Sequence, residues 1–150
     1  MISDAGIRLI KKYEGLSLVP YRCPAGIMTI GYGHAYNEDD EGLEKHFKNG
    51  ITREEAQELL KHDLEVFEKQ LDELKLNLNQ NQKDAVMSLI YNIGFERFKK
   101  SKTLKMLKAK DFDQMCFEWA DFCHITKDGE KIALSGLVNR RKAELDLFFS

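Results

Sequence analysis

Residues 13–34 read YEGLSLVPYRCPAGIMTIGYGH, and no other part of the sequence says as much about the structure. Prolines and glycines recur throughout this stretch, so a continuous helix is excluded. The apolar runs between them predict three short strands, at Leu18–Tyr21, Ile27–Ile30 and His34–Tyr36. We therefore expect a small, twisted antiparallel sheet with tight turns.

The sequence on either side of this stretch predicts helices. Ser3 is a suitable N-cap for a short helix that ends near Glu14. Residues 37–50 are polar and acidic, and they predict a loop with a helical turn around Leu43–Phe47. Thr52 then opens a helix of about 20 residues, roughly 30 Å long, with the spacing of a capping box. Such a helix is long enough to join two lobes.

The rest of the chain predicts a helical lobe. Residues 85–93 are strongly apolar, as expected of a buried core helix, and Gly94 is expected to end it. Further helices are expected at Thr103–Lys110, Phe112–Phe122 and Leu137–Phe148, with a turn at Lys127–Glu130. The predicted fold class is α+β, in one domain of 150 residues. We assign about 14–50 to a sheet lobe, 51–75 to a linking helix, and 76–150 with helix 3–14 to a mainly helical lobe.

Composition and charge exclude several classes of protein. The chain is 43% hydrophobic with a formal net charge of −2, which argues against intrinsic disorder and against a general polycation for nucleic acid. No apolar run approaches the ~20 residues of a membrane span, and we expect no signal peptide. Residues 97–110 hold seven basic and no acidic side chains. They form either a solvated helix face or a face for a polyanion, and charge alone does not choose.

Three cysteines are an odd number and too few for a disulfide framework in a chain of this length, so we expect reduced thiols. Cys116, Cys123 and His124 are conceivable metal ligands. Because the two cysteines lie in an apolar helical stretch without a CxxC pair, we expect no metal site there.

Glu14 is the residue best placed for chemistry. It lies at the C-terminal end of a predicted helix, where the helix dipole disfavours a negative charge. A carboxyl that keeps its proton near neutral pH is what a general acid requires. The following strand and turn bring Cys23 and Thr29 back toward it. The alternative is a surface glutamate beside a glycine-rich turn.

The pattern Glu14-Gly15, followed by Tyr-x-Cys-Pro-Ala-Gly-x-x-Thr-Ile-Gly-Tyr-Gly-His at residues 21–34, resembles the phage-type lysozymes (T4-like and lambdoid endolysins, glycoside hydrolase family 24). The resemblance covers nearly the whole chain. Its further parts are Ile51–Ala56 with Asp63, Asn81–Ala85, Tyr91–Gly94, Thr103–Leu104, Phe117–Ala120 and Gly136–Arg141.

This resemblance implies a muramidase that cleaves the β-1,4 bond between N-acetylmuramic acid and N-acetylglucosamine in peptidoglycan, causing lysis. The substrate would lie in a cleft between the two lobes. By position, Glu14 is the catalytic acid that protonates the glycosidic oxygen. Thr29 matches a threonine that helps to hold a water on the opposite face of the sugar. No cofactor is implied.

Cys23 departs from the best-known pattern of this family. It stands where many members carry an aspartate that stabilises the transition state and orients the water. A free thiol, with a reference pKa of ~8.5, is mostly neutral at pH 7. Three roles stay open: a general base, a nucleophile that attacks the anomeric carbon, or a small space-filling side chain. An activated water predicts inversion, whereas a covalent intermediate predicts retention.

The resemblance also implies supporting residues. Arg140 matches an arginine that pairs with the catalytic glutamate and orients it. His34 matches a histidine that pairs with the aspartate at Asp63, a structural contact between the sheet and the long helix. Tyr32 lines the cleft as a sugar-stacking residue or belongs to the core, while Trp119 is expected in the core.

We expect the partner to be peptidoglycan glycan strands, with no nucleic acid and no membrane span, and the protein to be a monomer. It would be made in the host cytoplasm and act on the cell wall or periplasm after release. The alternative function, kept open by Cys23, is a catalytically weakened lysozyme fold that only binds wall glycan.

Overall fold

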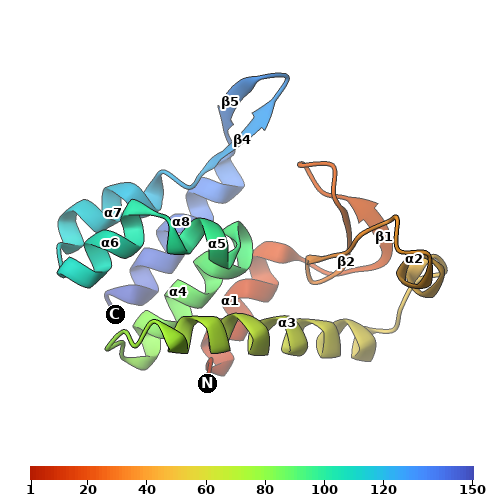
Figure 1. Ribbon diagram of the computed structural model, residues 1–150, viewed down its shortest axis with the longest axis horizontal. Coiled ribbons are helices and arrows are strands. Elements are labelled where there is room, and N and C mark those ends of the chain that lie inside the picture. Colours follow the sequence, from red (N-terminus) through yellow and green to blue (C-terminus); the bar gives the residue numbers. More distant parts are fainter. The chain divides into compact units, whose positions relative to one another are not determined.

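The computed structural model describes residues 1–150. The chain divides into two compact units. We call residues 11–65 the small unit and residues 1–10 with 66–150 the large unit. Helix α1 (Asp4–Glu14) and helix α3 (Arg53–Glu73) each run from one unit into the other (Figure 1). The observed α3 confirms the predicted long helix.

The small unit is built on the predicted three-stranded antiparallel sheet. Its order is β1 (Ser17–Arg22), β2 (Met28–Gly31) and β3 (His34–Ala35). Tyr21 pairs with Thr29, and Ile30 pairs with His34. The helical turn expected in the acidic loop is α2 (Glu41–Phe47), whose first N–H groups are capped by the Asp40 side chain.

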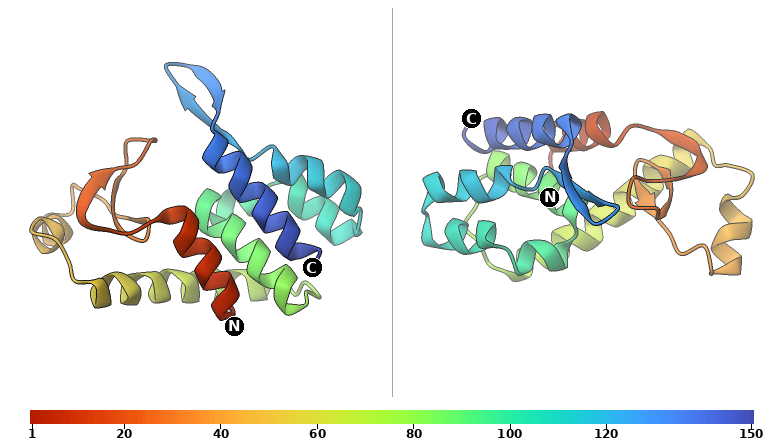
Figure 2. Two further views of the ribbon diagram at one scale, coloured as in Figure 1. Left: turned by 180° about the vertical axis from the view of Figure 1, so that it is seen from behind. Right: turned by 90° about the horizontal axis from the view of Figure 1, so that it is seen from above.

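The large unit is helical, as predicted. The bounds of its complete helices are α4 Gln80–Ile93, α5 Phe95–Lys99, α6 Lys102–Ala109, α7 Phe112–Ala120 and α8 Ser135–Phe148. Helix α4 is the core helix: residues 84–90 are all buried, and α4 packs along α8 (Figure 2, left). Gly94, at φ 90°, ends α4 as expected. Trp119 is fully buried, which confirms its place in the core.

The sequence did not predict the hairpin of β4 (His124–Lys127) and β5 (Glu130–Ala133), which projects from the large unit between α7 and α8 (Figures 1 and 2). The predicted turn at its tip is present, with Asp128 and Gly129 at positive φ. Because no residue of either strand is fully buried, the strands show no clear apolar alternation, and the Asp128-Gly129 pair was interpreted only as a turn.

None of the helices is both long and apolar enough to cross a membrane.

Candidate functional site

The small unit places the Glu14 carboxyl directly against the turn between β2 and β3. Glu14 is the last residue of α1, and Gly15 follows at φ 70° with its N–H bonded to the Lys11 carbonyl at 2.9 Å. A Cβ atom added to Gly33 would collide with Oε1 of Glu14 and lie 3.0 Å from the carboxyl carbon. Gly33 also has a φ of 82°. The glycine therefore serves both the backbone conformation and the space that the carboxyl occupies.

The carbonyl of Ile27 ties the two other predicted catalytic residues together. It accepts the Cys23 N–H at 3.0 Å and the Thr29 hydroxyl at 2.9 Å. Cys23 is half-buried at the start of a tight turn, since its own carbonyl accepts the Gly26 N–H at 2.8 Å. Thr29 is buried in β2. Because its hydroxyl hydrogen is directed to Ile27, the lone pairs on Oγ1 are what Thr29 offers to a water.

Tyr21 lies within the electrostatic influence of both Glu14 and Cys23, and the sequence did not single it out. It is paired with Thr29 across the sheet, so the two side chains share a face. Partial burial raises the pKa of the Tyr21 hydroxyl, and the negative charges of Glu14 and of the Cys23 thiolate raise it further. Both groups therefore act electrostatically on Tyr21. The only signal in the sequence was spacing: Tyr21 and Cys23 are two residues apart, so their side chains share one face of an extended strand.

The structure brings His34 and Asp63 together, as the resemblance implies. His34 Nδ1 lies 2.7 Å from Asp63 Oδ2, and about four fifths of each side chain is shielded from solvent. The Phe47 ring packs edge-on against the imidazole, with ring centroids 6.0 Å apart. This contact holds the end of the sheet to α3 within the small unit.

Tyr32 is only 7% exposed, and the Lys11 ammonium lies 5.0 Å from its ring centroid. Burial of this extent favours the core alternative over a sugar platform. Its part in substrate binding stays a prediction.

Arg140 belongs to a buried polar cluster in the large unit, where α4, α7 and α8 meet. Its Nε lies 3.3 Å from Glu144 Oε2, and its Nη2 donates to the Ser88 carbonyl at 3.1 Å. Glu144 also accepts from Ser88 Oγ at 2.5 Å, from Trp119 Nε1 at 3.0 Å and from Arg141 Nη2 at 3.1 Å. The Glu144 carboxylate is thus the centre of the cluster and fixes the Arg140 guanidinium.

Neither Glu144 nor Ser88 was assigned a role from the sequence. The spacing of Glu144 four residues after Arg140 on one helix is the signal that could have indicated the ion pair. Ser88 carried no such signal, because its partners lie on a helix some 50 residues away in the chain.

The chain is similar to known proteins over its whole length. A protein-family model described as phage lysozyme matches residues 11–144. The endolysin of Acyrthosiphon pisum secondary endosymbiont phage 1 is 39% identical over 150 residues, which cover 99% of this chain and 98% of that protein.

Two solved structures extend this similarity to the fold. The muramidase domain of SpmX from Asticaccaulis excentricus has a TM-score of 0.85 at 31% identity, covering all of this chain and 98% of that one. A mutant of P22 lysozyme has a TM-score of 0.75 at 37% identity, covering all of this chain and 99% of that one.

Proposed function

The chain belongs to the phage lysozyme family, and we propose that it is an endolysin whose catalytic groups are Glu14, Cys23 and Thr29. It is a muramidase, a glycosidase that acts on the peptidoglycan of the cell wall. The observation that supports these catalytic groups best is the close contact of the Glu14 carboxyl with Gly33. The negative charges of Glu14 and Cys23, which both raise the pKa of Tyr21, agree with it.

In the proposed reaction, Glu14 donates its proton to the oxygen of the β-1,4 bond between N-acetylmuramic acid and N-acetylglucosamine. The bond to the anomeric carbon breaks as the leaving sugar takes this proton, and positive charge develops on the ring. The Thr29 hydroxyl, already donating to Ile27, accepts a hydrogen bond from the attacking water. The resemblance assigns to Arg140 the pairing with Glu14, which stays a prediction.

If Cys23 is more than a space-filling side chain, it acts by one of two routes, which differ in their products. As a base, its thiolate removes a proton from the water held at Thr29, and the product has inverted configuration. As a nucleophile, its sulfur bonds to the anomeric carbon, and water then releases the sugar with retention. NMR of the newly formed reducing end, on wild type and Cys23→Ser, separates the routes. First appearance of the α-anomer means inversion, whereas the β-anomer with a trapped thiol adduct means retention.

The competing function is a weakened lysozyme fold that only binds wall glycan. Clearing of outer-membrane-permeabilised cells by the wild type, together with reducing ends in the supernatant, supports the enzyme. Retention on purified peptidoglycan without clearing, at any protein concentration tested, supports the binding module and refutes the catalytic assignment.

We also propose that the protein is a monomer, made in the host cytoplasm and released to the wall. Gel filtration tests the first statement, and cell fractionation before lysis tests the second.

A further inference from the structure

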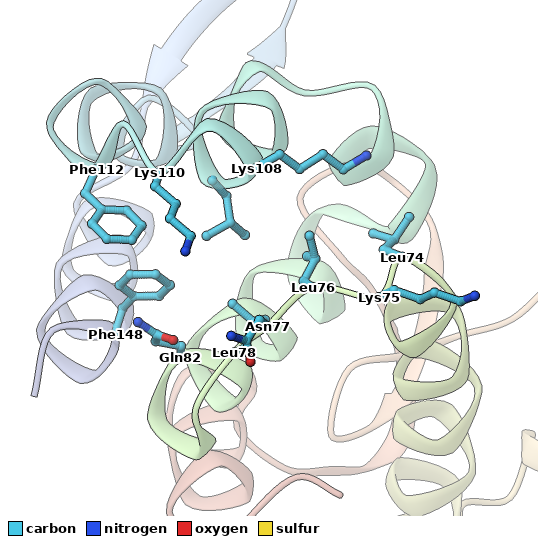
Figure 3. Close-up of a pocket in the computed structure, with 11 residues that line it drawn as sticks. Leu74, Lys75, Leu76, Asn77, Leu78, Gln82, Lys108, Lys110, Phe112 and Phe148 are labelled. Atoms are coloured by element: carbon cyan, nitrogen blue, oxygen red, sulfur yellow. The ribbon is translucent and has the colours of Figure 1, made fainter.

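The large unit contains a hollow of about 470 Å³, and none of the proposed catalytic residues lines it. Its volume lies within the range of ligand pockets in proteins. The hollow opens between the segment joining α3 to α4, the end of α6 and the C-terminal end of α8 (Figure 3). Its lining consists of Leu74, Lys75, Leu76, Asn77, Leu78, Gln82, Leu107, Lys108, Lys110, Phe112 and Phe148.

The larger part of the wall of this hollow is apolar. Four leucines and two phenylalanines provide it, and the two aromatic rings meet edge to face with centroids 5.7 Å apart. Phe148 and Leu107 form the buried floor, at 2% and 6% exposure. Binding of an apolar chain to such a surface removes the chain from water, which lowers the free energy of the system.

The polar groups of the lining are all cations or amides. Three lysines contribute to it and no carboxylate does. The Lys110 ammonium points into the space beside Phe112, Lys108 runs along the rim, and Lys75 points away from the hollow (Figure 3). Lys108 and Lys110 also end the basic stretch 97–110, which contains no acidic residue. An anionic group at this mouth is therefore favoured over a neutral or cationic one.

We propose that this hollow binds a single-chain anionic amphiphile, with its apolar chain against the leucines and phenylalanines, its head group at the Lys110 ammonium, and Lys108 adding positive charge at the rim. Two ligand types share this chemistry, a long-chain fatty acid with a carboxylate head and a lysophospholipid with a phosphate head. None of its lining residues takes part in the proposed glycosidase chemistry.

The only tryptophan of the chain provides the readout. Trp119 packs edge to face against Phe148 with ring centroids 5.6 Å apart, so a brominated chain in the hollow lies close enough to quench its fluorescence. The full-length protein is titrated with a brominated fatty acid below its micelle concentration. A brominated alcohol of the same length is the neutral control, and a brominated lysophosphatidylglycerol is the phosphate arm.

Saturable quenching by either anion, at least tenfold tighter than by the alcohol, supports the proposal, and the tighter anion identifies the head group. The double variant Lys108→Glu with Lys110→Glu is expected to weaken binding at least tenfold. Lys110→Gln, which removes one charge, is expected to act in the same direction. The matched control is Lys102→Glu with Lys105→Glu, two exposed lysines of α6 outside the lining, with an expected change below threefold.

The proposal is overturned if neither anion quenches, or if the alcohol binds as tightly as the anions. It is equally overturned if both double variants, with wild-type circular dichroism, weaken binding to the same extent, because the effect is then general charge attraction.

Discussion

Single residues of the small unit set the position of the proposed catalytic carboxyl. Gly33 leaves the space that the Glu14 carboxyl occupies, and the negative charges of Glu14 and Cys23 raise the pKa of Tyr21. The sequence predicted Glu14, Cys23 and Thr29 from their place in the motif, whereas Gly33 was only one of the recurring glycines that predict tight turns in that stretch. The close approach of Glu14 to Gly33 could not be predicted, because it depends on how the end of α1 meets the sheet.

The substitution Gly33→Ala tests this close approach. The new methyl group must displace the carboxyl, and misplacement of a reacting group by about 1 Å can cost ~10²-fold in rate. The positive φ adds strain of about 1–3 kcal/mol. We expect lytic activity on purified peptidoglycan to fall by about 10²-fold. The free energy of unfolding, measured in urea, should fall by about 1–3 kcal/mol because of the strain. Gly26→Ala, also at positive φ but with open space around it, is the matched control. Equal activity of the two variants would contradict the account.

Tyr21 provides a spectroscopic test of the same site. Because negative neighbours disfavour the tyrosinate, removing one of them must lower the pKa of Tyr21 toward its ordinary value. We expect this fall in both Glu14→Gln and Cys23→Ser, measured by NMR titration of ring-labelled tyrosine. An unchanged Tyr21 titration in both variants would place these groups apart.

At the scale of helices and strands, side chains that join two elements stabilise each unit. Glu144 connects α8 with α4 through Ser88 and with α7 through Trp119, at distances of 2.5 and 3.0 Å. His34 and Asp63 connect β3 with α3. Helices and strands with clear periodicity were predicted well from the sequence. The five-residue helix α5 and the β4–β5 hairpin were missed, since the first is too short and the second too exposed to show a pattern.

Replacing Glu144 by alanine would leave the Arg140 and Arg141 guanidinium groups buried without this carboxylate. Removing one partner of a buried ion pair costs about 3–5 kcal/mol, so we expect the free energy of unfolding to fall by that amount. Trp119→Phe, which removes one hydrogen bond to Glu144, should cost about 1–3 kcal/mol. Urea denaturation measures both. A loss below 1 kcal/mol in Glu144→Ala would show that the cluster is not structural.

Replacing His34 by glutamine should destabilise the small unit, because it weakens the bond to Asp63 and leaves that carboxylate partly buried. We expect about 1–3 kcal/mol. His62→Gln, at an exposed position next to Asp63, is expected to change stability by less than 0.5 kcal/mol, as is usual for surface positions. Hydrogen exchange of the strand amides localises the effect. Equal protection in the two variants would argue against a structural role of the pair.

At the scale of the whole molecule, stability is linked to pH through Glu68. Burial acts to raise its pKa, but the N-terminal ammonium at 3.0 Å, the Ile2 N–H at 2.9 Å and the Lys83 ammonium at 3.3 Å outweigh burial and lower it. A carboxylate with a lowered pKa in the folded state contributes stability above its unfolded pKa. That contribution is lost as the pH falls through the folded pKa.

Glu68→Gln is therefore expected to cost about 1–3 kcal/mol at pH 7. The difference from wild type should shrink as the pH falls below the ordinary range of a glutamate, near 4.3. Thermal unfolding between pH 7 and pH 3 measures it. A difference that stays constant, or grows, toward acid pH would contradict the assigned direction.

The fold class, the family, the first sheet and the longer helices were predictable from the sequence, because local periodicity and the motif at residues 13–34 point to the same answer. The apolar hollow of the large unit was not predictable. Its leucines and lysines come from segments far apart in the chain, and each looks like an ordinary loop or helix residue in its own segment.

The central claim is that Glu14 donates the proton that breaks the glycosidic bond, and Glu14→Gln tests it most directly. Removing a general acid costs about 10²–10⁴-fold in rate. With reducing-end release from purified peptidoglycan as the measurement, we expect at least a hundredfold slower cleavage, while circular dichroism and retention on peptidoglycan match the wild type. Cleavage by a folded Glu14→Gln protein at a rate within threefold of the wild type would contradict the claim.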